Sequence, residues 1–235
     1  MLNIADITKF TMQDYPNRLA CIVWFAGCNM RCRYCYNVEL LEQKSDFLSE
    51  ERILQFLREK VGLLDGVVLS GGECTLEKEL GSFAAKIKNM GFLLKIDTNG
   101  LNPDMVRSLV ENNLVDFVAL DFKAPENKFT EVTQLDRIFY EKFKNTLGFT
   151  VKSYLEKKID MEIRTTVHTS LLQEDDINKI ISEIDSAGYR GNFYLQNFKN
   201  DGKSTLANLE SQTRLLDVSK ILKPQNFFLG YRNFF

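Results

Sequence analysis

Short apolar runs alternate with amphipathic stretches along most of this chain. The runs fall at Leu19–Ala26, Gly66–Ser70, Phe92–Thr98, Val115–Phe122, Met161–Val167, Asn192–Gln196 and Asn226–Tyr231. Strands separated by helices build βα units with a parallel sheet, because each parallel strand needs a long crossover connection. About six such units are present, whereas a complete eight-unit barrel usually needs roughly 250 residues. The pattern therefore predicts an α/β fold built as an open, partial barrel.

The stretches between these runs predict the helices. We expect helices at Ser49–Lys60 with Ser49 as N-cap, Leu76–Met90 before a C-capping Gly91, Pro103 to about Asn112, Leu135–Leu147, Glu174–Ala187 and Leu206–Leu222. The most polar connection, Lys123–Thr133, is predicted to be a surface loop. Because no break in composition marks a second domain, residues 1–235 are expected to form a single domain.

Charge and hydropathy exclude several classes of protein. Thirty Lys and Arg stand against 32 Asp and Glu, which gives a net charge of -2 and no basic field for nucleic acid. The apolar stretch Leu19–Gly27 is too short to span a bilayer. Met1–Asp6 carries no basic residue of the kind that begins a secretory leader. We expect a cytoplasmic protein without a nucleic-acid or membrane partner.

Three of the five cysteines crowd into one short loop. Cys28, Cys32 and Cys35 have the spacing C-x3-C-x2-C directly after the first predicted strand. An odd number of cysteines without a leader argues against a disulfide framework. Three thiolates on one loop can bind three irons of a [4Fe–4S] cluster and leave the fourth iron open to a ligand.

A structural zinc site is the alternative interpretation of the cysteine loop. Zinc would require a fourth ligand in closed tetrahedral geometry. Cys21, Cys74 and the single histidine, His168, could each be proposed, but none has the spacing typical of zinc sites.

The cysteine spacing, with an aromatic residue before the last cysteine, resembles the signature of radical S-adenosylmethionine (SAM) enzymes. The resemblance implies a partial (β/α)6 barrel, with residues 28–35 as the cluster loop. It implies that Cys28, Cys32 and Cys35 hold a [4Fe–4S] cluster, and that Tyr34 and Tyr36 pack near the adenine of SAM. Beyond the cluster and SAM, it implies no separate catalytic residue.

A glycine-rich turn after the second predicted strand strengthens the resemblance. Gly71, Gly72 and Glu73 resemble the GGE motif that holds the amino group of SAM. Glycines allow close approach of the backbone, and a carboxylate accepts hydrogen bonds from an ammonium group. Without the preceding cysteine loop, a plain strand-to-helix turn would be the favoured interpretation.

The next two predicted strands end in charged motifs. Asp97 and Thr98 begin a DTNG segment, and Asp121 and Lys123 form a D-x-K segment. Both resemble the branch of radical SAM proteins that activates glycyl radical enzymes, in which the lysine meets the SAM carboxylate. The resemblance also allows a monovalent cation near Asp97 and Asp121. A capping role for Asp97 and a solvated charge pair at Asp121 are the structural alternatives.

Three residues of the second half complete the candidate SAM site. Arg164, Gln196 and Asn197 lie at strand positions that could face the cofactor, and an arginine can bind a carboxylate with two hydrogen bonds. Pairing of Arg164 with a surface acid, and strand capping by Gln196, are the alternatives.

The segment before the cysteines points to the same branch. Phe10–Ala20 resembles the lead-in of the activators of anaerobic ribonucleotide reductase and pyruvate formate-lyase, with Asn17 where glycine is usual. The resemblance implies an activase that cleaves SAM reductively to a 5′-deoxyadenosyl radical and installs a glycyl radical on a partner enzyme. Anaerobic ribonucleotide reductase is the expected partner, and flavodoxin or ferredoxin the expected electron donor.

Two other functions remain open from the sequence. One is a radical SAM enzyme that acts on a small molecule, such as a deazapurine synthase. The other is a metal-binding protein without catalysis.

Overall fold

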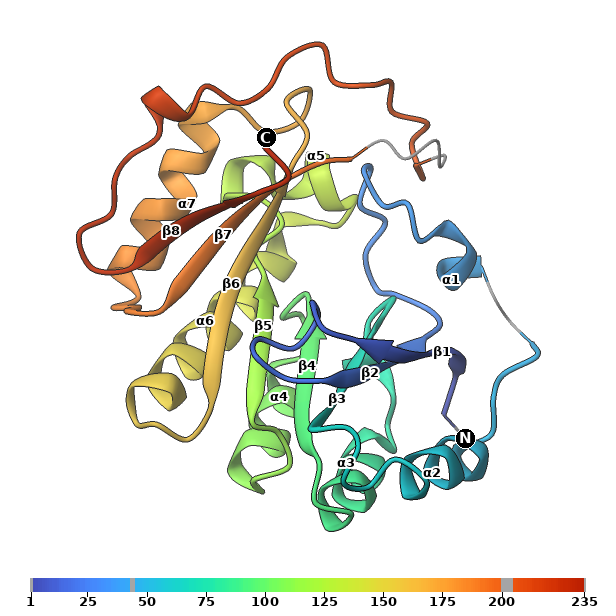
Figure 1. Ribbon diagram of the computed structural model, residues 1–235. Helices are drawn as coiled ribbons and strands as arrows, with labels where there is room; N and C mark the ends of the chain where they lie inside the picture. Colours follow the sequence, from blue (N-terminus) through green and yellow to red (C-terminus); the bar gives the residue numbers. More distant parts are fainter. Residues whose placement is uncertain (1, 43–44, 200–204, 235) are drawn as a thin grey trace.

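An open β-sheet whose strands follow one another in chain order forms the centre of the protein (Figure 1). The computed structural model describes residues 2–42, 45–199 and 205–234. In these residues the strands are β1 (Ile4–Thr11), β2 (Ala20–Phe25), β3 (Gly66–Gly71), β4 (Leu93–Thr98), β5 (Phe117–Asp121), β6 (Asp160–Val167), β7 (Asn192–Asn197) and β8 (Phe228–Arg232). Strands β2 to β8 are parallel, and β1 pairs antiparallel with β2. The predicted α/β fold with an open parallel sheet is confirmed.

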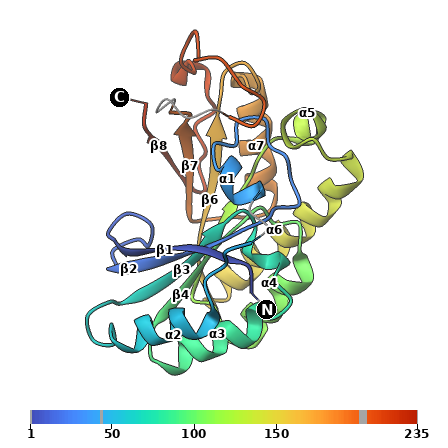
Figure 2. The same ribbon diagram turned by 90° about the vertical axis from the view of Figure 1, so that its right-hand side faces the viewer.

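The helices pack mainly against one face of this sheet, and Figure 2 shows α2, α3, α4 and α6 gathered on that side. In the described residues they are α1 (Val38–Glu42), α2 (Glu50–Arg58), α3 (Leu80–Asn89), α4 (Pro103–Glu111), α5 (Phe129–Thr133), α6 (Tyr140–Leu155) and α7 (Glu174–Ser186). Short 3-10 turns lie at Cys74–Leu76, Glu126–Lys128, Arg137–Phe139 and Val218–Lys220. Because every parallel strand ends at the same edge of the sheet, the loops that carry the predicted motifs meet there.

Two apolar clusters hold the helices to the sheet. In one, α2, α3 and α4 pack against β2 to β5, with Phe83 and Leu109 fully buried. In the other, α5, α6 and α7 pack against β5 to β8, with Phe122 and Ile180 fully buried. The apolar runs of the sequence form this core, and the charged motifs that follow them lie beyond it.

Local signals in the sequence correctly placed several element ends. Ser49 caps α2, because its side chain accepts a hydrogen bond from the Arg52 N–H. Gly91 follows the end of α3 with a positive φ of 90°, as a C-capping glycine does. The predicted helix from Leu135 begins later, at Tyr140, and extends to Leu155.

The sequence pattern missed strand β1. Its side chains are mostly half-exposed, and Asp6 and Lys9 interrupt any apolar run, so an edge strand was not apparent. The turn after β1 contains Asn17 at a φ of 58°, the left-handed conformation that favours glycine. Asparagine tolerates this conformation better than most residues, which explains why it can replace the usual glycine.

The predicted helix at Leu206–Leu222 is wrong. In this range the structure has extended chain and turns, with a single 3-10 turn at Val218–Lys220. Polar side chains explain the difference, because Thr205 accepts a hydrogen bond from the Leu209 N–H and Gln212 bonds to the backbone of Phe198. Such side-chain bonds compete with helix formation.

The predicted surface loop at Lys123–Thr133 is also wrong. It contains a 3-10 turn and helix α5, and Phe129 and Val132 of α5 are buried. Because the segment is mostly polar, the sequence pattern did not reveal that these two apolar residues are buried. In the described residues, no helix is long and apolar enough to cross a membrane.

Candidate functional site

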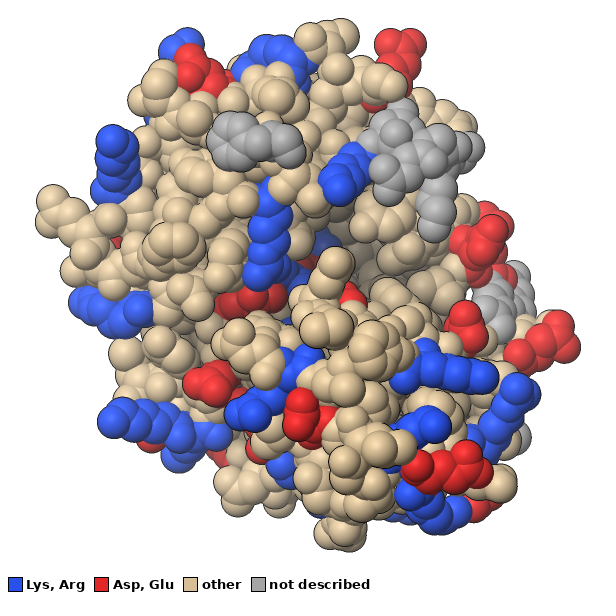
Figure 3. All heavy atoms as spheres, viewed as in Figure 1, with Lys and Arg blue, Asp and Glu red and all other residues tan. Residues whose placement is uncertain are grey.

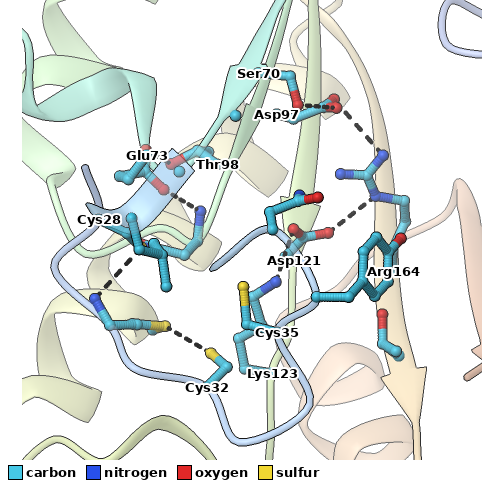
Figure 4. A pocket seen from close by; sticks show the side chains of 18 of the residues that line it. Cys28, Cys32, Cys35, Ser70, Glu73, Asp97, Thr98, Asp121, Lys123 and Arg164 are labelled. Atoms are coloured by element: carbon cyan, nitrogen blue, oxygen red, sulfur yellow. Dashed lines mark hydrogen bonds and ion pairs between the residues drawn. The ribbon is translucent and has the colours of Figure 1, made fainter. Parts of the chain in front are cut away.

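A cavity of about 290 Å³ lies at the carboxyl ends of the parallel strands. Figure 4 shows Cys28 below Glu73 and Thr98, and Cys35 beside Lys123 and below Asp121, with Arg164 farther to the right. Of the residues singled out from the sequence, those that line it are Cys28, Cys32, Tyr34, Cys35, Tyr36, Gly71, Gly72, Glu73, Asp97, Thr98, Asp121, Lys123, Arg164 and Gln196. The fold therefore brings together segments that are far apart in the sequence.

Asn197 is the candidate that the structure places elsewhere. It does not line this cavity but a neighbouring one, and its side-chain oxygen accepts a hydrogen bond of 3.0 Å from Gln212. Gln196, the preceding residue of β7, lines both cavities, whereas Asn197 lines only the second.

The cysteine loop follows β2 and has its three thiols free. The Cys28 sulfur accepts a hydrogen bond of 3.4 Å from the Met30 N–H, and the Cys35 N–H donates to the Cys32 carbonyl at 2.9 Å. Burial raises the pKa of Cys28 to about 11 and that of Cys32 to about 12. A metal centre at this loop would have to displace the protons of these thiols.

Glycine allows the turn after β3 to contact the start of the cysteine loop. A β-carbon on Gly72 would lie 1.9 Å from the carbonyl oxygen of Gly27, and Gly71 has a φ of 123°. The Glu73 N–H donates to the same Gly27 carbonyl at 2.9 Å. Any larger residue at position 72 would separate the two loops, so this glycine is required by close backbone approach.

The Glu73 carboxylate is buried, with 2% of the residue exposed, and accepts hydrogen bonds from three residues. The Thr98 hydroxyl donates at 2.8 Å, the Asn99 N–H at 2.7 Å, and the hydroxyl and N–H of Thr75 also donate. Burial raises the pKa of Glu73, although these hydrogen bonds oppose the rise. The carboxylate therefore ties the end of β4 to the turn after β3.

Asp97, at the end of β4, is surrounded by donors from the protein itself. Ser70 donates to it at 3.0 Å, Lys95 forms an ion pair with it, and the Arg164 guanidinium lies 3.6 Å away. Burial favours a higher pKa, but Arg164 and Lys95 hold the pKa of Asp97 below its usual range. Asp97 is therefore an anion at neutral pH.

Asp121, at the end of β5, joins Arg164 to Lys123. The Arg164 Nε donates to Asp121 at 2.9 Å, and the Lys123 Nζ lies 3.0 Å from the other carboxylate oxygen. Although burial opposes it, Arg164 and Lys123 lower the pKa of Asp121 to about 2. Asp121 in turn raises the pKa of Lys123 against the effect of burial. This wall of the cavity therefore presents fixed charges of both signs.

The two tyrosines of the cysteine loop differ in exposure. The Tyr34 side chain is buried, and among the described residues its hydroxyl is the only buried side-chain polar atom without a hydrogen-bond partner. Tyr36 is 49% exposed, and its ring lies 6.4 Å from that of Phe198. Buried polar atoms are rarely left unpaired.

The structure adds lining residues that were not among the predicted site residues: Asp14, Trp24, Met30, Asn37, Leu41, Ser70, Asn99 and Thr166. The Asn99 side chain donates to Asn29 at 2.8 Å and lies 3.7 Å from the Cys28 sulfur. A motif signal for Asn99 was present, because it is part of DTNG. Trp24 and Thr166 belong to no motif, because only the direction of their strands brings them to the cavity.

The donor set fits a cluster with an open position and SAM beside it. Three free thiols face one cavity, the buried Tyr34 hydroxyl has no hydrogen-bond partner, and charged residues of both signs line the same cavity. Cys21, Cys74 and His168, the candidates for a fourth zinc ligand, do not line this cavity. Within the described ranges, no three His, Cys, Asp or Glu side chains are grouped so as to hold a single metal ion.

Comparison with known families identifies the class of protein. The family model of the radical SAM superfamily matches residues 22–168, which is more than half of the chain. The chain belongs to the radical SAM superfamily, and it is an enzyme of the radical SAM oxidoreductase type. Membership implies a [4Fe–4S] cluster and SAM, and the alternative of a non-catalytic metal-binding protein is set aside.

Two curated relatives bear on the branch. A Methanocaldococcus jannaschii protein, whose name provisionally assigns it to glycyl-radical enzyme activation, is 33% identical over 185 residues, covering 77% of this chain and 75% of its own. The 7-carboxy-7-deazaguanine synthase of Clostridium acetobutylicum is 26% identical over 156 residues, covering 65% of this chain and 69% of its own. The predicted resemblance to the activating branch is confirmed.

A solved structure supports the fold. The crystal structure of Streptococcus suis SuiB bound to S-adenosylmethionine superposes on 90% of this chain with a TM-score of 0.64 and 13% sequence identity. The match covers 52% of the SuiB chain, so the present chain corresponds to about half of that protein.

Proposed function

We propose that this protein is a radical SAM activase that installs a glycyl radical on a larger partner enzyme. The observation that supports this most is the shared cavity, which joins three free thiols to the GGE, DTNG and D-x-K segments. When bound, the cluster and SAM supply a reductively generated radical that removes a hydrogen atom from the substrate. Relatives named for the same activity support this branch.

The residues of this chain bind the cluster and SAM and hold them in position. Cys28, Cys32 and Cys35 are the proposed cluster ligands. Lys123 is the proposed partner of the SAM carboxylate, because its ammonium group is pre-positioned at the cavity wall by Asp121. Gly71 and Gly72 provide the backbone edge for the methionine end of SAM. The Glu73 carboxylate holds that edge in place. Within the described residues its Oε1 accepts from Thr75 and Thr98, whereas its Oε2 accepts from the Asn99 N–H alone and can accept one further hydrogen bond.

Other residues shape the rest of the cofactor site. Tyr34 and Tyr36 are proposed to flank the adenine, and Arg164 and Gln196 to line the side nearest the substrate. Asn197 is proposed to act only indirectly, through its bond to Gln212. A monovalent cation near Asp97 and Asp121 remains a prediction, and Lys95, Arg164 and Lys123 already provide positive charge there.

The open sheet favours the proposal that the substrate is a macromolecule. Trp24 of β2 and Gln196 of β7 both line the cavity, so it spans nearly the whole row of parallel strands in a sheet whose edges, β1 and β8, are not paired with each other. Figure 3 shows a hollow near the centre of this face, with Lys, Arg, Asp and Glu side chains around it. A flexible glycine loop could enter there, and anaerobic ribonucleotide reductase is the proposed partner. Flavodoxin or ferredoxin is the proposed electron donor.

The first experiment tests the cofactor chemistry. After anaerobic reconstitution, the protein should contain about four irons and four sulfides per chain. Reduction with dithionite in the presence of SAM should then yield 5′-deoxyadenosine and methionine. Bound zinc in place of iron, without charge-transfer absorbance, would contradict the proposal.

A small-molecule substrate is the second candidate, favoured by the relative named 7-carboxy-7-deazaguanine synthase. In that case a purine-like metabolite should consume the radical stoichiometrically, and no partner protein should be needed. Product analysis of the reconstituted enzyme with a set of purine-like metabolites distinguishes the two candidates.

A further inference from the structure

An extended segment of the chain lies across the carboxyl ends of β6 and β7 and reaches the cysteine loop (Figure 1). We call residues 205–217 the strap. It was expected to be helical, and its backbone is instead bonded to other elements. Its contacts connect the cysteine loop to His168, a residue outside the candidate site.

At its first end, the strap forms one side of a support around the cysteine loop. The Leu206 N–H donates to the Cys35 carbonyl at 2.8 Å, and the Ala207 N–H donates to the Arg33 carbonyl at 3.2 Å. On the other side of the loop, the Arg31 and Arg33 N–H groups donate to the last carbonyls of α5 at 2.9 and 3.0 Å. The loop is therefore bonded along both edges, as a strand is in a sheet.

In its middle, the strap is fastened by His168, of which 2% is exposed. The His168 Nε2 lies 3.0 Å from the Glu210 carbonyl, and a carbonyl can only accept, so Nε2 carries the proton. The Nδ1 atom then accepts from the hydroxyl of Ser170 at 2.8 Å and from its N–H at 3.3 Å. The neighbours thus fix the neutral tautomer and the orientation of the ring.

The far end of the strap is held independently of His168. Thr169 binds both Gln212 and the Arg214 carbonyl at 2.8 Å, and Arg214 forms two hydrogen bonds with Glu174 of α7. Loss of the His168 bond would therefore release the section nearest the cysteine loop while the far end stays attached.

We propose that His168 is a positioning residue for the cysteine loop and that it acts through the strap. By binding Glu210, it holds the N–H groups of Leu206 and Ala207 against the carbonyls of Arg33 and Cys35. This inference rests on the proposed function in one respect, that the loop holds an iron–sulfur cluster. Residues that orient metal ligands in this way typically change metal affinity about 10- to 100-fold when they are replaced.

Two substitutions separate the strap bond from the local bond to Ser170. The amide nitrogen of His168→Gln occupies a place close to that of Nε2 and can still donate to Glu210. The shorter side chain of His168→Asn reaches the place of Nδ1 and can accept from Ser170, but it cannot reach Glu210. Both variants carry a side-chain amide, and they differ only in the length of the side chain.

The first measurement uses the metal-free chain. Amide hydrogen exchange at Leu206 and Ala207 should accelerate at least about 10-fold in His168→Asn and return to nearly the wild-type rate in His168→Gln. Thermal unfolding of both variants reports any general loss of stability. Equal exchange rates in all three proteins would overturn the inference, whether or not a cluster binds.

The second measurement follows the reconstituted cluster. Iron release to a chelator should be about 10-fold faster in His168→Asn than in the wild type, with His168→Gln close to the wild type. The midpoint potential of the cluster should shift only in His168→Asn. If both variants lose iron equally fast, the role of His168 is local packing and the inference is overturned. If the wild-type protein takes up no cluster, the proposed function fails, and the exchange measurement still decides the role of the strap.

Discussion

At the scale of single residues, the three thiols of the cysteine loop differ from the other two cysteines in position. Cys28, Cys32 and Cys35 line the cavity, whereas Cys21 and Cys74 are fully buried outside it. Replacing any one of the loop cysteines by alanine should abolish SAM cleavage, because a thiolate ligand is lost.

The matched controls are Cys21→Ala and Cys74→Ala, which should retain both iron and SAM cleavage. Iron analysis and 5′-deoxyadenosine formation are measured on all five variants. Loss of cleavage in the control variants at full iron content, or its survival in a loop variant, would contradict the assignment of the ligands.

Glu73 provides a second prediction at this scale. In Glu73→Gln, an amide NH₂ replaces one carboxylate oxygen among donors from Thr75, Thr98 and Asn99, so one of these donors loses its acceptor. The change should weaken SAM binding about 10-fold or more, since hydrogen bonds to charged groups contribute about 1.5–3 kcal/mol. The cluster should remain. SAM affinity is measured by equilibrium titration of the cluster-loaded variant.

The control for this prediction is Glu79→Gln, an exposed acid close in sequence. It should bind SAM as the wild type does. If Glu73→Gln also binds SAM normally while it keeps its cluster, Glu73 has no part in the SAM site.

At the scale of elements, apolar runs predicted the parallel strands well, because buried strands require continuous apolar sequence. The same logic could not find β1, whose side chains are half-exposed, nor the buried anchors of α5 inside a polar segment. The motifs likewise predicted most of the residues that line the cavity, because each motif directly follows a strand. Trp24 and Thr166 could not be predicted, since only the register of neighbouring strands brings them to the cavity.

The strap also carries a pH-dependent contact with α7. Glu174 accepts two hydrogen bonds from Arg214, at 2.6 and 2.9 Å, and one from the Asp217 N–H at 2.8 Å. The hydrogen bonds from Arg214 lower the pKa of Glu174 from 4.5 to about 2. A lowered pKa in the folded state stabilises the fold above pH 4.5, and this contribution is lost as the pH falls toward 2.

Glu174→Gln should therefore reduce the free energy of unfolding by about 1–2 kcal/mol at pH 7, since the pair is partly exposed and screened by solvent. The difference from the wild type should shrink as the pH falls from 4.5 toward 2. Denaturant unfolding at a series of pH values measures both curves. Parallel curves over this range would show that the carboxylate charge of Glu174 does not contribute.

At the scale of the whole molecule, the sheet stays open between β1 and β8, and the cavity is lined by residues from β2 to β7. A small substrate would need a cover over the cavity to exclude water. A flexible loop of a partner protein could itself serve as that cover. Such a loop is ordered only on binding, so the isolated complex should be weak. We propose that residues 1–235 act as a single radical SAM domain in this complex.

Electron paramagnetic resonance of the partner enzyme tests directly whether the protein is an activase. The reduced, SAM-loaded protein is mixed anaerobically with the host's anaerobic ribonucleotide reductase and, in parallel, with its other glycyl radical enzymes. We expect a glycyl doublet on the reductase, and we expect it to be absent when Cys28→Ala replaces the wild-type protein. If none of these enzymes acquires a doublet while a purine-like metabolite consumes the radical stoichiometrically, the protein is not an activase.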